Sequence, residues 1–243
     1  MELYNTDCLD KMKDIPDNTI DLLFCDLPYG QTSCKWDSLI DLDLFWKEVN
    51  RICKDTTPMF FTCSTKFGVS LINSNPKNFR YDLVWVKSAP CGFLNAKRMP
   101  MKKHEMIYVF YRKLPFYDLS SHTHKFLKKE KSQTSKEMKA GINNLYGDMK
   151  GGAIGNIHGT NYDPPLPNSL LEISSQKGKH STQKPVDLIK WCLMYYSKEG
   201  DTVLDPTMGS GSTGVACKEM NRNFIGIEKD TDIYNSALKR LYD

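Results

Sequence analysis

The fold is decided by ten consecutive residues, Asp205-Pro206-Thr207-Met208-Gly209-Ser210-Gly211-Ser212-Thr213-Gly214. They follow a short apolar run at 202–204 and lead into a helical pattern at 213–220, which predicts a strand, a glycine-rich turn and a helix in that order. Gly-x-Gly-x-x-Gly in such a turn is typical of a nucleotide-binding loop. The sequence therefore predicts an α/β fold with a ligand at this turn, and a purely structural turn is the alternative.

The acidic residues around the turn select among its ligands. Asp205 ends the predicted strand, where its charge would repel the pyrophosphate of NAD or FAD, and no Lys or Arg lies inside the turn. Glu228 ends the next apolar run, where its carboxylate can accept both hydroxyls of a ribose. A cationic nucleoside without phosphate fits both residues, which favours S-adenosylmethionine, with its sulfonium and ammonium near Asp205. An NAD-dependent oxidoreductase is the alternative enzyme.

The rest of the chain alternates apolar runs with helical patterns, which predicts a mostly parallel sheet with helices on both faces. Strands are expected at 20–25, 59–63, 81–86, 106–111, 202–204 and 224–227, and helices at 42–53, 67–72, 185–197, 213–220 and 232–241. Periodicity is lost from 113 to 175, a stretch too long for an ordinary loop. The prediction is one core in two parts, 1–112 and 176–243, with an insert at 113–175.

A second motif, Asp26-Leu27-Pro28-Tyr29-Gly30, follows the first long apolar run. It places an acid, a stiff backbone and an aromatic ring at the carboxyl end of a predicted parallel strand, where open α/β sheets bind ligands. Taken alone, the motif is equally compatible with a turn that carries a capping aspartate and a surface tyrosine.

Together, the two motifs resemble those of S-adenosylmethionine-dependent DNA amino-methyltransferases, whose signature is Asp/Asn/Ser-Pro-Pro-Tyr/Phe/Trp. The chain order, with the catalytic motif first and the cofactor turn last, is similar to their permuted beta group. The resemblance does not extend through 113–175. It implies a circularly permuted, Rossmann-like methyltransferase fold with the insert as target-recognition region. Further matching segments are Asp7-Cys8, Trp85-Val86-Lys87, His104-Glu105 and Ser181-Thr182-Gln183-Lys184-Pro185.

The resemblance also implies roles for individual residues. Leu27 stands where the family usually has Pro, but any residue supplies a backbone carbonyl, and Pro28 keeps Leu27 extended. Catalysis is expected at Asp26, Leu27, Pro28 and Tyr29. The cofactor is expected to contact Asp7, Cys8, Asp26, Lys184, Asp205, Thr207, Gly209, Ser210, Gly211, Ser212, Thr213 and Glu228.

The chemistry explains the catalytic motif. The lone pair of an exocyclic amine is delocalised into the base, and two acceptors, the Asp26 carboxylate and the carbonyl of residue 27, can hold both amino hydrogens and localise it. Tyr29 would stack on a base that has left the duplex. Asp first and Tyr last favour adenine N6 by family association. Cytosine N4, an RNA base methyltransferase and a nonenzymatic DNA-binding module are the alternatives.

Positive charge is concentrated in one segment. Residues 87–139 hold 13 of the 33 Lys and Arg but only 4 of the 29 Asp and Glu, a net charge of +9 that leaves −5 elsewhere. This block predicts contact with duplex DNA, and a solvated basic loop is the alternative. The candidate phosphate contacts are Lys87, Lys102, Lys103, Lys128 and Lys129. Bases would be read by the polar stretch 143–168.

Composition excludes several classes of protein. With 40% hydrophobic and 26% charged residues, the chain can bury a core, so it is not disordered. Residues 1–7 do not form a signal peptide, and no apolar run spans a membrane. The eight scattered cysteines predict reduced thiols and no metal site. A cytoplasmic protein is expected, and the resemblance allows a homodimer and a cognate restriction endonuclease as partners.

Overall fold

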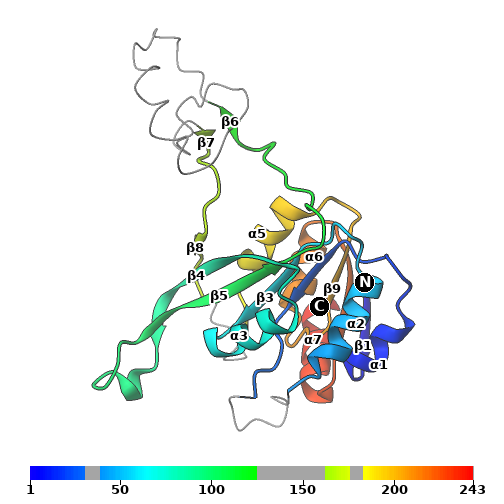
Figure 1. Cartoon of the computed structure of the whole chain (residues 1–243), viewed down its shortest axis with the longest axis horizontal. Helices are drawn as coiled ribbons and strands as arrows, with labels where there is room; N and C mark the ends of the chain where they lie inside the picture. The colour runs from blue at the N-terminus through cyan, green and yellow to red at the C-terminus, as the bar shows by residue number, and fades with distance from the viewer. Residues whose placement is uncertain (31–38, 125–161, 176–182, 243) are drawn as a thin grey trace. The chain divides into compact units, whose positions relative to one another are not determined.

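The computed structural model describes residues 1–30, 39–124, 162–175 and 183–242 (Figure 1). The chain forms two compact units, Met1–Asp118 with Ser169–Asp243, and Leu119–Asn168. An eight-stranded sheet builds the first unit, and only its β3–β5 and β5–β4 pairs are antiparallel. The strand order is β1 (Glu2–Asn5), β10 (Asn223–Glu228), β9 (Thr202–Asp205), β2 (Leu22–Cys25), β3 (Met59–Cys63), β5 (Lys102–Phe110), β4 (Phe79–Cys91) and β8 (Leu170–Glu172).

Helices cover both faces of this sheet, as expected (Figure 1). One group of helices in mutual contact is α1 (Cys8–Lys11), α2 (Leu42–Ile52) and α3 (Thr65–Ser74), and the other is α5 (Val186–Tyr196), α6 (Ser212–Glu219) and α7 (Thr231–Tyr242). Side chains fix several starts: Asp41 accepts from the N–H groups of Asp43 and Leu44 at α2, and Asp7 caps α1.

Aromatic packing holds the α2 side of the core together. Trp46 of α2 is buried beside Phe45, Phe61 and Phe110, and its ring lies 5.2 to 5.6 Å from the other three ring centroids. The indole N–H donates to Ser74 Oγ at 2.8 Å, which satisfies the polar end of the ring. This packing fixes α2 and α3 against β3.

The two sequence motifs meet because β2 and β9 are neighbours in the sheet. Leu22 and Leu23 pair in parallel with Val203 and Leu204, although about 180 residues separate them. From β9 the chain continues to β10 on one side, whereas from β2 it continues to β3 on the other. This reversal of strand order opens a ligand-binding crevice at the carboxyl ends of both strands.

The expected elements are all present, with shifted ends. Strand β2 begins at Leu22 rather than 20, and Ile20 forms only an isolated bridge to Cys53. Strands β4 and β5 are longer than expected because they continue as a hairpin beyond the core. The sequence pattern does not predict the two short edge strands, β1 and β8, or the very short helix α1.

The second unit is narrower than the expected insert 113–175. At one end, the Lys113 N–H donates to Asp55 O at 2.9 Å and the Asp118 N–H to Tyr195 O at 2.8 Å, so 113–118 stay with the core. At the other end, β8 pairs with β4. Within the second unit, β6 (Thr123–His124) pairs with β7 (Tyr162–Asp163). Residues 125–161 lie outside the described residues, and Lys128 and Lys129 with them.

The described ranges contain neither a membrane-spanning helix nor a cluster of metal ligands. No helix in these ranges is long and apolar enough to cross a membrane. They also contain no group of three or more His, Cys, Asp or Glu that could hold a metal ion. The seven cysteines within them are free thiols, and all but Cys91 are buried.

Candidate active site

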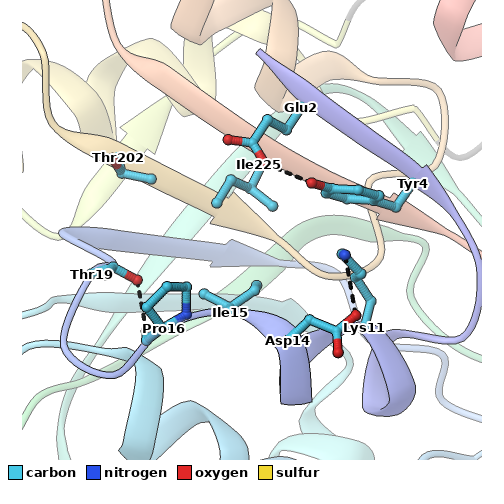
Figure 2. Close-up of a pocket in the computed structure, with 9 residues that line it drawn as sticks. All are labelled: Glu2, Tyr4, Lys11, Asp14, Ile15, Pro16, Thr19, Thr202 and Ile225. Atoms are coloured by element: carbon cyan, nitrogen blue, oxygen red, sulfur yellow. Dashed lines mark hydrogen bonds and ion pairs between the residues drawn. The ribbon is translucent and has the colours of Figure 1, made fainter.

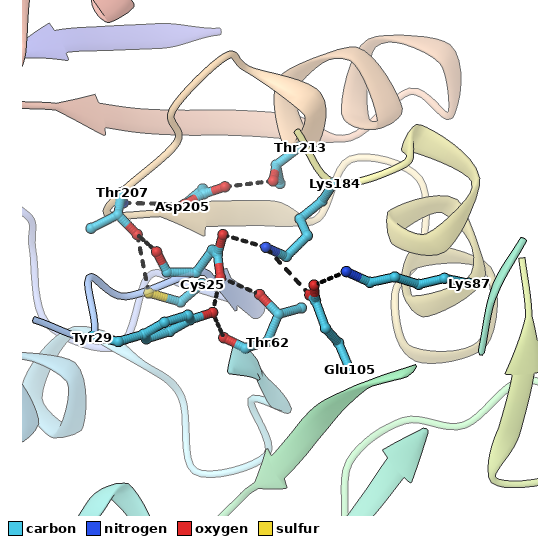
Figure 3. A network of polar contacts seen from close by, with 10 residues as sticks. Cys25, Tyr29, Thr62, Lys87, Glu105, Lys184, Asp205, Thr207 and Thr213 are labelled. Carbon is cyan, nitrogen blue, oxygen red and sulfur yellow. Dashed lines mark hydrogen bonds and ion pairs between the residues drawn. The ribbon is translucent and has the colours of Figure 1, made fainter. Parts of the chain in front are cut away.

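The Asp26 carboxylate, directly after β2, accepts hydrogen bonds from three side chains. Its Oδ1 accepts from Thr62 Oγ1 at 2.7 Å and lies 2.5 Å from the Tyr29 hydroxyl. Its Oδ2 accepts from Lys184 Nζ at 2.5 Å. Figure 3 shows how the donors converge from β3, the loop after β2 and the start of α5. The three donors hold the carboxylate in one orientation at the carboxyl edge of the sheet.

Lys184 continues this network away from Asp26. Its Nζ lies 3.6 Å from Glu105 Oε2, and Glu105 Oε1 forms an ion pair with Lys87 (Figure 3). Burial lowers the pKa of the Lys184 ammonium, but the carboxylates of Asp26 and Glu105 outweigh it and raise that pKa overall. Burial raises the pKa of Glu105, and Lys184 and Lys87 reverse this to a net lowering. Four charges of alternating sign therefore stabilise one another.

These contacts refine two of the sequence predictions. Lys184 is predicted to contact the cofactor; its ammonium lies on the Asp26 carboxylate, and the cofactor contact stays a prediction. Lys87 was expected to touch substrate phosphate, but its Nζ is paired with Glu105 and lies 5.1 Å from the Trp85 ring centroid. A phosphate contact by Lys87 would have to break this ion pair.

Tyr29 belongs to the same site. Its hydroxyl lies 2.8 Å from Thr62 O as well as close to Asp26, and its ring packs on Phe67 at 5.3 Å between centroids. Burial and the neighbouring Asp26 charge raise the pKa of this phenol far above its usual value, so it stays a donor. The side chain of Leu27 is buried in the core, which anchors the backbone between Asp26 and Pro28.

The glycine turn is organised by Asp205 at the end of β9. Its carboxylate accepts from Thr213 Oγ1 at 2.5 Å and from the Thr207 N–H at 3.1 Å. Burial raises the pKa of Asp205 to about 7. Gly209 and Gly211 have φ of +52° and +78°, which favours glycine at both positions, and Gly211 is the N-cap residue directly before α6.

Thr207 joins the turn to the catalytic motif. Its hydroxyl donates to Asp26 O at 3.1 Å and lies 3.5 Å from Cys25 Sγ. The two motifs, from opposite ends of the chain, are thus in direct hydrogen-bond contact across β2 and β9.

Glu228 and Asp7 lie at the ends of the strands beyond β9. Glu228 accepts from the Gly209 N–H at 3.0 Å and the Asp230 N–H at 2.8 Å, and burial raises its pKa. Asp7 accepts from the Leu9 N–H at 2.9 Å and pairs with Lys229 at 2.9 Å; burial would raise the pKa of Asp7, but these bonds lower it. Cys8 is buried, which raises its pKa to about 12.

Three contributing residues were not predicted. Thr62 is a polar residue in an apolar strand, a signal that was available but not used. Glu105 was noted only as part of a matching pair. Arg240 of α7 gave no sequence signal, yet its guanidinium contacts Ser210 O at 3.0 Å, Ser210 Oγ at 3.2 Å and Ser212 Oγ at 3.1 Å, which fixes the glycine turn from behind.

A separate pocket of about 250 Å³ lies at the opposite edge of the sheet (Figure 2). It is lined by the first residues of β1 and β9, Glu2 and Thr202, and its polar groups pair with one another, as Tyr4 with Glu2 and Lys11 with Asp14. None of the predicted site residues lines it.

Known proteins place the chain in a family. A family model described as DNA methylase matches residues 20–239. The chain belongs to this DNA methylase family. The resemblance to DNA amino-methyltransferases is therefore confirmed.

Individual relatives differ in how much of their length the chain covers. It is 28% identical over 264 residues to Type II methyltransferase M.HinfI of Haemophilus influenzae, covering 97% of this chain and 66% of that protein. It is 28% identical over 250 residues to DNA adenine methyltransferase YhdJ of Escherichia coli (strain K12), covering 98% and 82%. The match to M.HindIII of Haemophilus influenzae is 52% identical over 68 residues, 28% of this chain and 22% of that protein. The chain thus spans just under two thirds of M.HinfI and less of M.HindIII.

Solved structures confirm the fold of the chain. The M1.HpyAVI–SAM complex matches with a TM-score of 0.64 at 23% identity, covering 99% of each chain. The PvuII DNA methyltransferase (cytosine-N4-specific) matches with a TM-score of 0.69 at 16% identity, covering 99% of this chain and 86% of that one. The fold is that of a Rossmann-like methyltransferase, as the resemblance implied.

Proposed function

We propose that this DNA methylase transfers a methyl group from S-adenosylmethionine to the N6 amino group of adenine in duplex DNA. The observation that carries the proposal is the direct contact between the two motifs. Thr207 of the glycine turn donates to the backbone of Asp26, so a cofactor at the turn would lie beside the catalytic carboxylate.

The residues at the turn fit the cofactor. The carboxylates of Asp26, Asp205 and Glu228 lie at one edge of the sheet. Burial disfavours the ionised form of the latter two and so raises their pKa. A cationic ligand would stabilise this ionised form and would therefore be favoured there. The two glycines at positive φ leave backbone that a ligand can approach closely. Glu228 would accept the ribose hydroxyls. When bound, S-adenosylmethionine supplies an electrophilic methyl group on a sulfonium.

Hydrogen bonds within the protein already occupy some of the lone pairs of the Asp26 carboxylate. The remaining lone pairs determine how an amine can bind. Thr62 and Tyr29 both approach Oδ1, whereas Lys184 occupies one of the two lone-pair positions on Oδ2. One amino hydrogen would therefore bind Oδ2, and the other would bind the Leu27 carbonyl. Held this way, the nitrogen lone pair points out of the base plane, toward the turn.

The chain's own residues would promote the reaction by orienting the amine and by electrostatic stabilisation. Lys184 donates a charge-assisted hydrogen bond to Oδ2, which holds the Asp26 carboxylate in place as an acceptor. The Thr62 and Tyr29 bonds fix its plane, which lowers the entropic cost of aligning the amine with the methyl group. After transfer, the amine carries one excess proton, and Oδ2 is the acceptor in contact with it.

The choice of base has one rival. The relative named YhdJ is a DNA adenine methyltransferase, which favours adenine for this chain. The structural neighbour from PvuII is cytosine-N4-specific, so cytosine N4 is the second candidate. Both bases present an exocyclic amine, and both would use Asp26 in the same way.

Partners and location follow from the same proposal. The relatives named Type II methyltransferases support a site-specific activity and, with it, a cognate endonuclease. We also propose an intracellular location with genomic DNA, a possible second copy of the chain as partner, and target recognition by the insert 113–175, including Lys128 and Lys129.

The deciding experiment is transfer of a labelled methyl group to unmethylated genomic DNA, followed by nucleoside analysis. We expect N6-methyladenine from the wild-type protein and no label from the Asp26→Ala variant. Label in N4-methylcytosine would select the second candidate. Label in RNA alone, or no transfer by a folded protein that binds S-adenosylmethionine, would contradict the proposal.

A further inference from the structure

The hairpin between β4 and β5 projects from the edge of the sheet that carries Asp26. Cys63, the last residue of β3, pairs with Met106, so the part of β5 before Met106 lies beyond the carboxyl end of β3. Val86 pairs with His104 and Cys91 with Lys102, which continues the hairpin outward (Figure 1). We call residues 88–104 the arm. Every residue of the arm is exposed.

The tip of the arm exposes large apolar side chains. Phe93 and Leu94, in a short 3-10 helix, are 81% and 97% exposed, and Met99 and Met101 are also exposed. Large apolar side chains exposed together mark a binding site more often than a solvated loop does. Among the residues that the structure describes, none covers these four side chains, which leaves them available to a partner.

The charges on the arm select the partner. The arm contains four cations, Lys97, Arg98, Lys102 and Lys103, and no Asp or Glu. Only an anionic surface complements them. At the base of the arm, Glu105 contacts Lys184, which binds Asp26, so the arm and the catalytic carboxylate share one edge of the molecule.

We infer that the arm binds duplex DNA beside the target base, with its cations on phosphates and with Phe93 and Leu94 as an apolar wedge against the base pairs. This inference rests on the proposed function. Withdrawal of a base from the duplex leaves its neighbours partly unstacked, at a cost of a few kcal/mol. Apolar side chains inserted at such a step stabilise the opened duplex, and flanking cations hold the backbone in place.

Two double variants separate the wedge from the phosphate contacts. Phe93→Ala with Leu94→Ala should reduce methyl transfer to unmethylated genomic duplex DNA by about tenfold or more, and should leave affinity for S-adenosylmethionine and the salt dependence of DNA binding unchanged. Lys97→Gln with Arg98→Gln should reduce the slope of log affinity against log salt by about 2, since each lost phosphate contact removes about 1.

Matched controls lie away from the arm. Val69→Ala removes an exposed apolar side chain from α3, and Lys47→Gln with Lys77→Gln removes two exposed cations from α2 and from the turn before β4. These variants should retain wild-type transfer and wild-type salt dependence.

Several outcomes would overturn the inference. If the wild type is active and the arm variants behave like the controls, DNA is contacted elsewhere and the proposed function still holds. Loss of self-association in Phe93→Ala with Leu94→Ala, with transfer retained, would make the arm an interface between copies. Loss of binding to phosphatidylserine vesicles, with transfer retained, would make it a membrane surface. A wild type that methylates no DNA would instead contradict the proposed function.

Discussion

The ammonium of Lys184 lies 2.5 Å from Oδ2 of Asp26, although the two residues are 158 positions apart in the chain. Lys184 also faces Glu105, so its removal would leave two half-buried carboxylates without their shared counter-charge. A charge-assisted hydrogen bond is stronger than a neutral one and holds its partner more firmly. The position of the Asp26 carboxylate therefore depends on Lys184.

The first prediction concerns this pair. Lys184→Met should reduce turnover by about tenfold or more, because Asp26 Oδ2 loses the charge-assisted hydrogen bond that holds the carboxylate in place. Lys184→Arg keeps a charged donor at this position and should keep more of the turnover. Methyl transfer measured at saturating S-adenosylmethionine and DNA decides this. Wild-type turnover in Lys184→Met would show that Lys184 does not position Asp26.

The second prediction concerns Asp26 itself. Asp26→Ala removes one of only two acceptors for the target amine, so turnover should fall by roughly three orders of magnitude or more, in line with the loss of a charge-stabilising group from an active site. Affinity for S-adenosylmethionine, measured by calorimetry, should change much less. Near-wild-type turnover in this variant would disprove the mechanism.

The proximity of the two motifs was predictable from the sequence, because local pattern and position coincide there. Asp26 and Asp205 end strands, and the carboxyl ends of neighbouring parallel strands meet at one edge of a sheet, so their proximity followed from the α/β pattern. The contacts of Lys184 and Arg240 depend on long-range packing of α5 and α7, which no local pattern encodes. The same holds for β8, whose three residues form a strand only because β4 offers a free edge.

The third prediction concerns Glu228. Its carboxylate accepts from Gly209 and Asp230 and is proposed to accept two ribose hydroxyls. Each charge-assisted hydrogen bond contributes roughly 1.5–3 kcal/mol, so Glu228→Ala should weaken S-adenosylmethionine binding by about tenfold or more. Glu219→Ala, on the exposed side of α6, is the matched control and should bind normally. Calorimetry measures both, and an unchanged affinity in folded Glu228→Ala would place the nucleoside elsewhere.

The fourth prediction concerns stability against pH. Asp205 has a pKa of about 7 in the folded protein, against 3.8 ordinarily, so the folded state holds this proton more tightly than the unfolded state does. The contribution of Asp205 to the free energy of unfolding is therefore highest below about pH 4 and is lost as the pH rises to about 7. Asp205→Asn has no such dependence.

This difference is measurable by urea unfolding at several pH values. Relative to wild type, the free energy of unfolding of Asp205→Asn should rise by roughly 2–4 kcal/mol between pH 4 and pH 7 and then stay level, because a shift of one pKa unit corresponds to about 1.4 kcal/mol. A constant difference across this range would show that folding does not raise the pKa of Asp205.

The fifth prediction concerns the basic segment 87–139. If it holds the DNA backbone, the logarithm of affinity for duplex should fall linearly with the logarithm of salt concentration, by about 0.9 per phosphate contacted. Lys102 and Lys103 are exposed at the start of β5, so Lys102→Gln with Lys103→Gln should lower this slope by about 2. Lys128→Gln with Lys129→Gln tests the insert in the same way.

The two pairs should weaken binding to all sequences alike, because a phosphate contact positions the protein without reading bases. Changes in the polar stretch 143–168 should instead alter which sequences are methylated. Filter binding from about 50 to 200 mM salt measures the slope, with Lys47→Gln and Lys77→Gln as the matched pair outside the segment. Slopes equal to that of the wild type in both lysine pairs would show that the segment is a solvated loop and that the phosphates are held elsewhere.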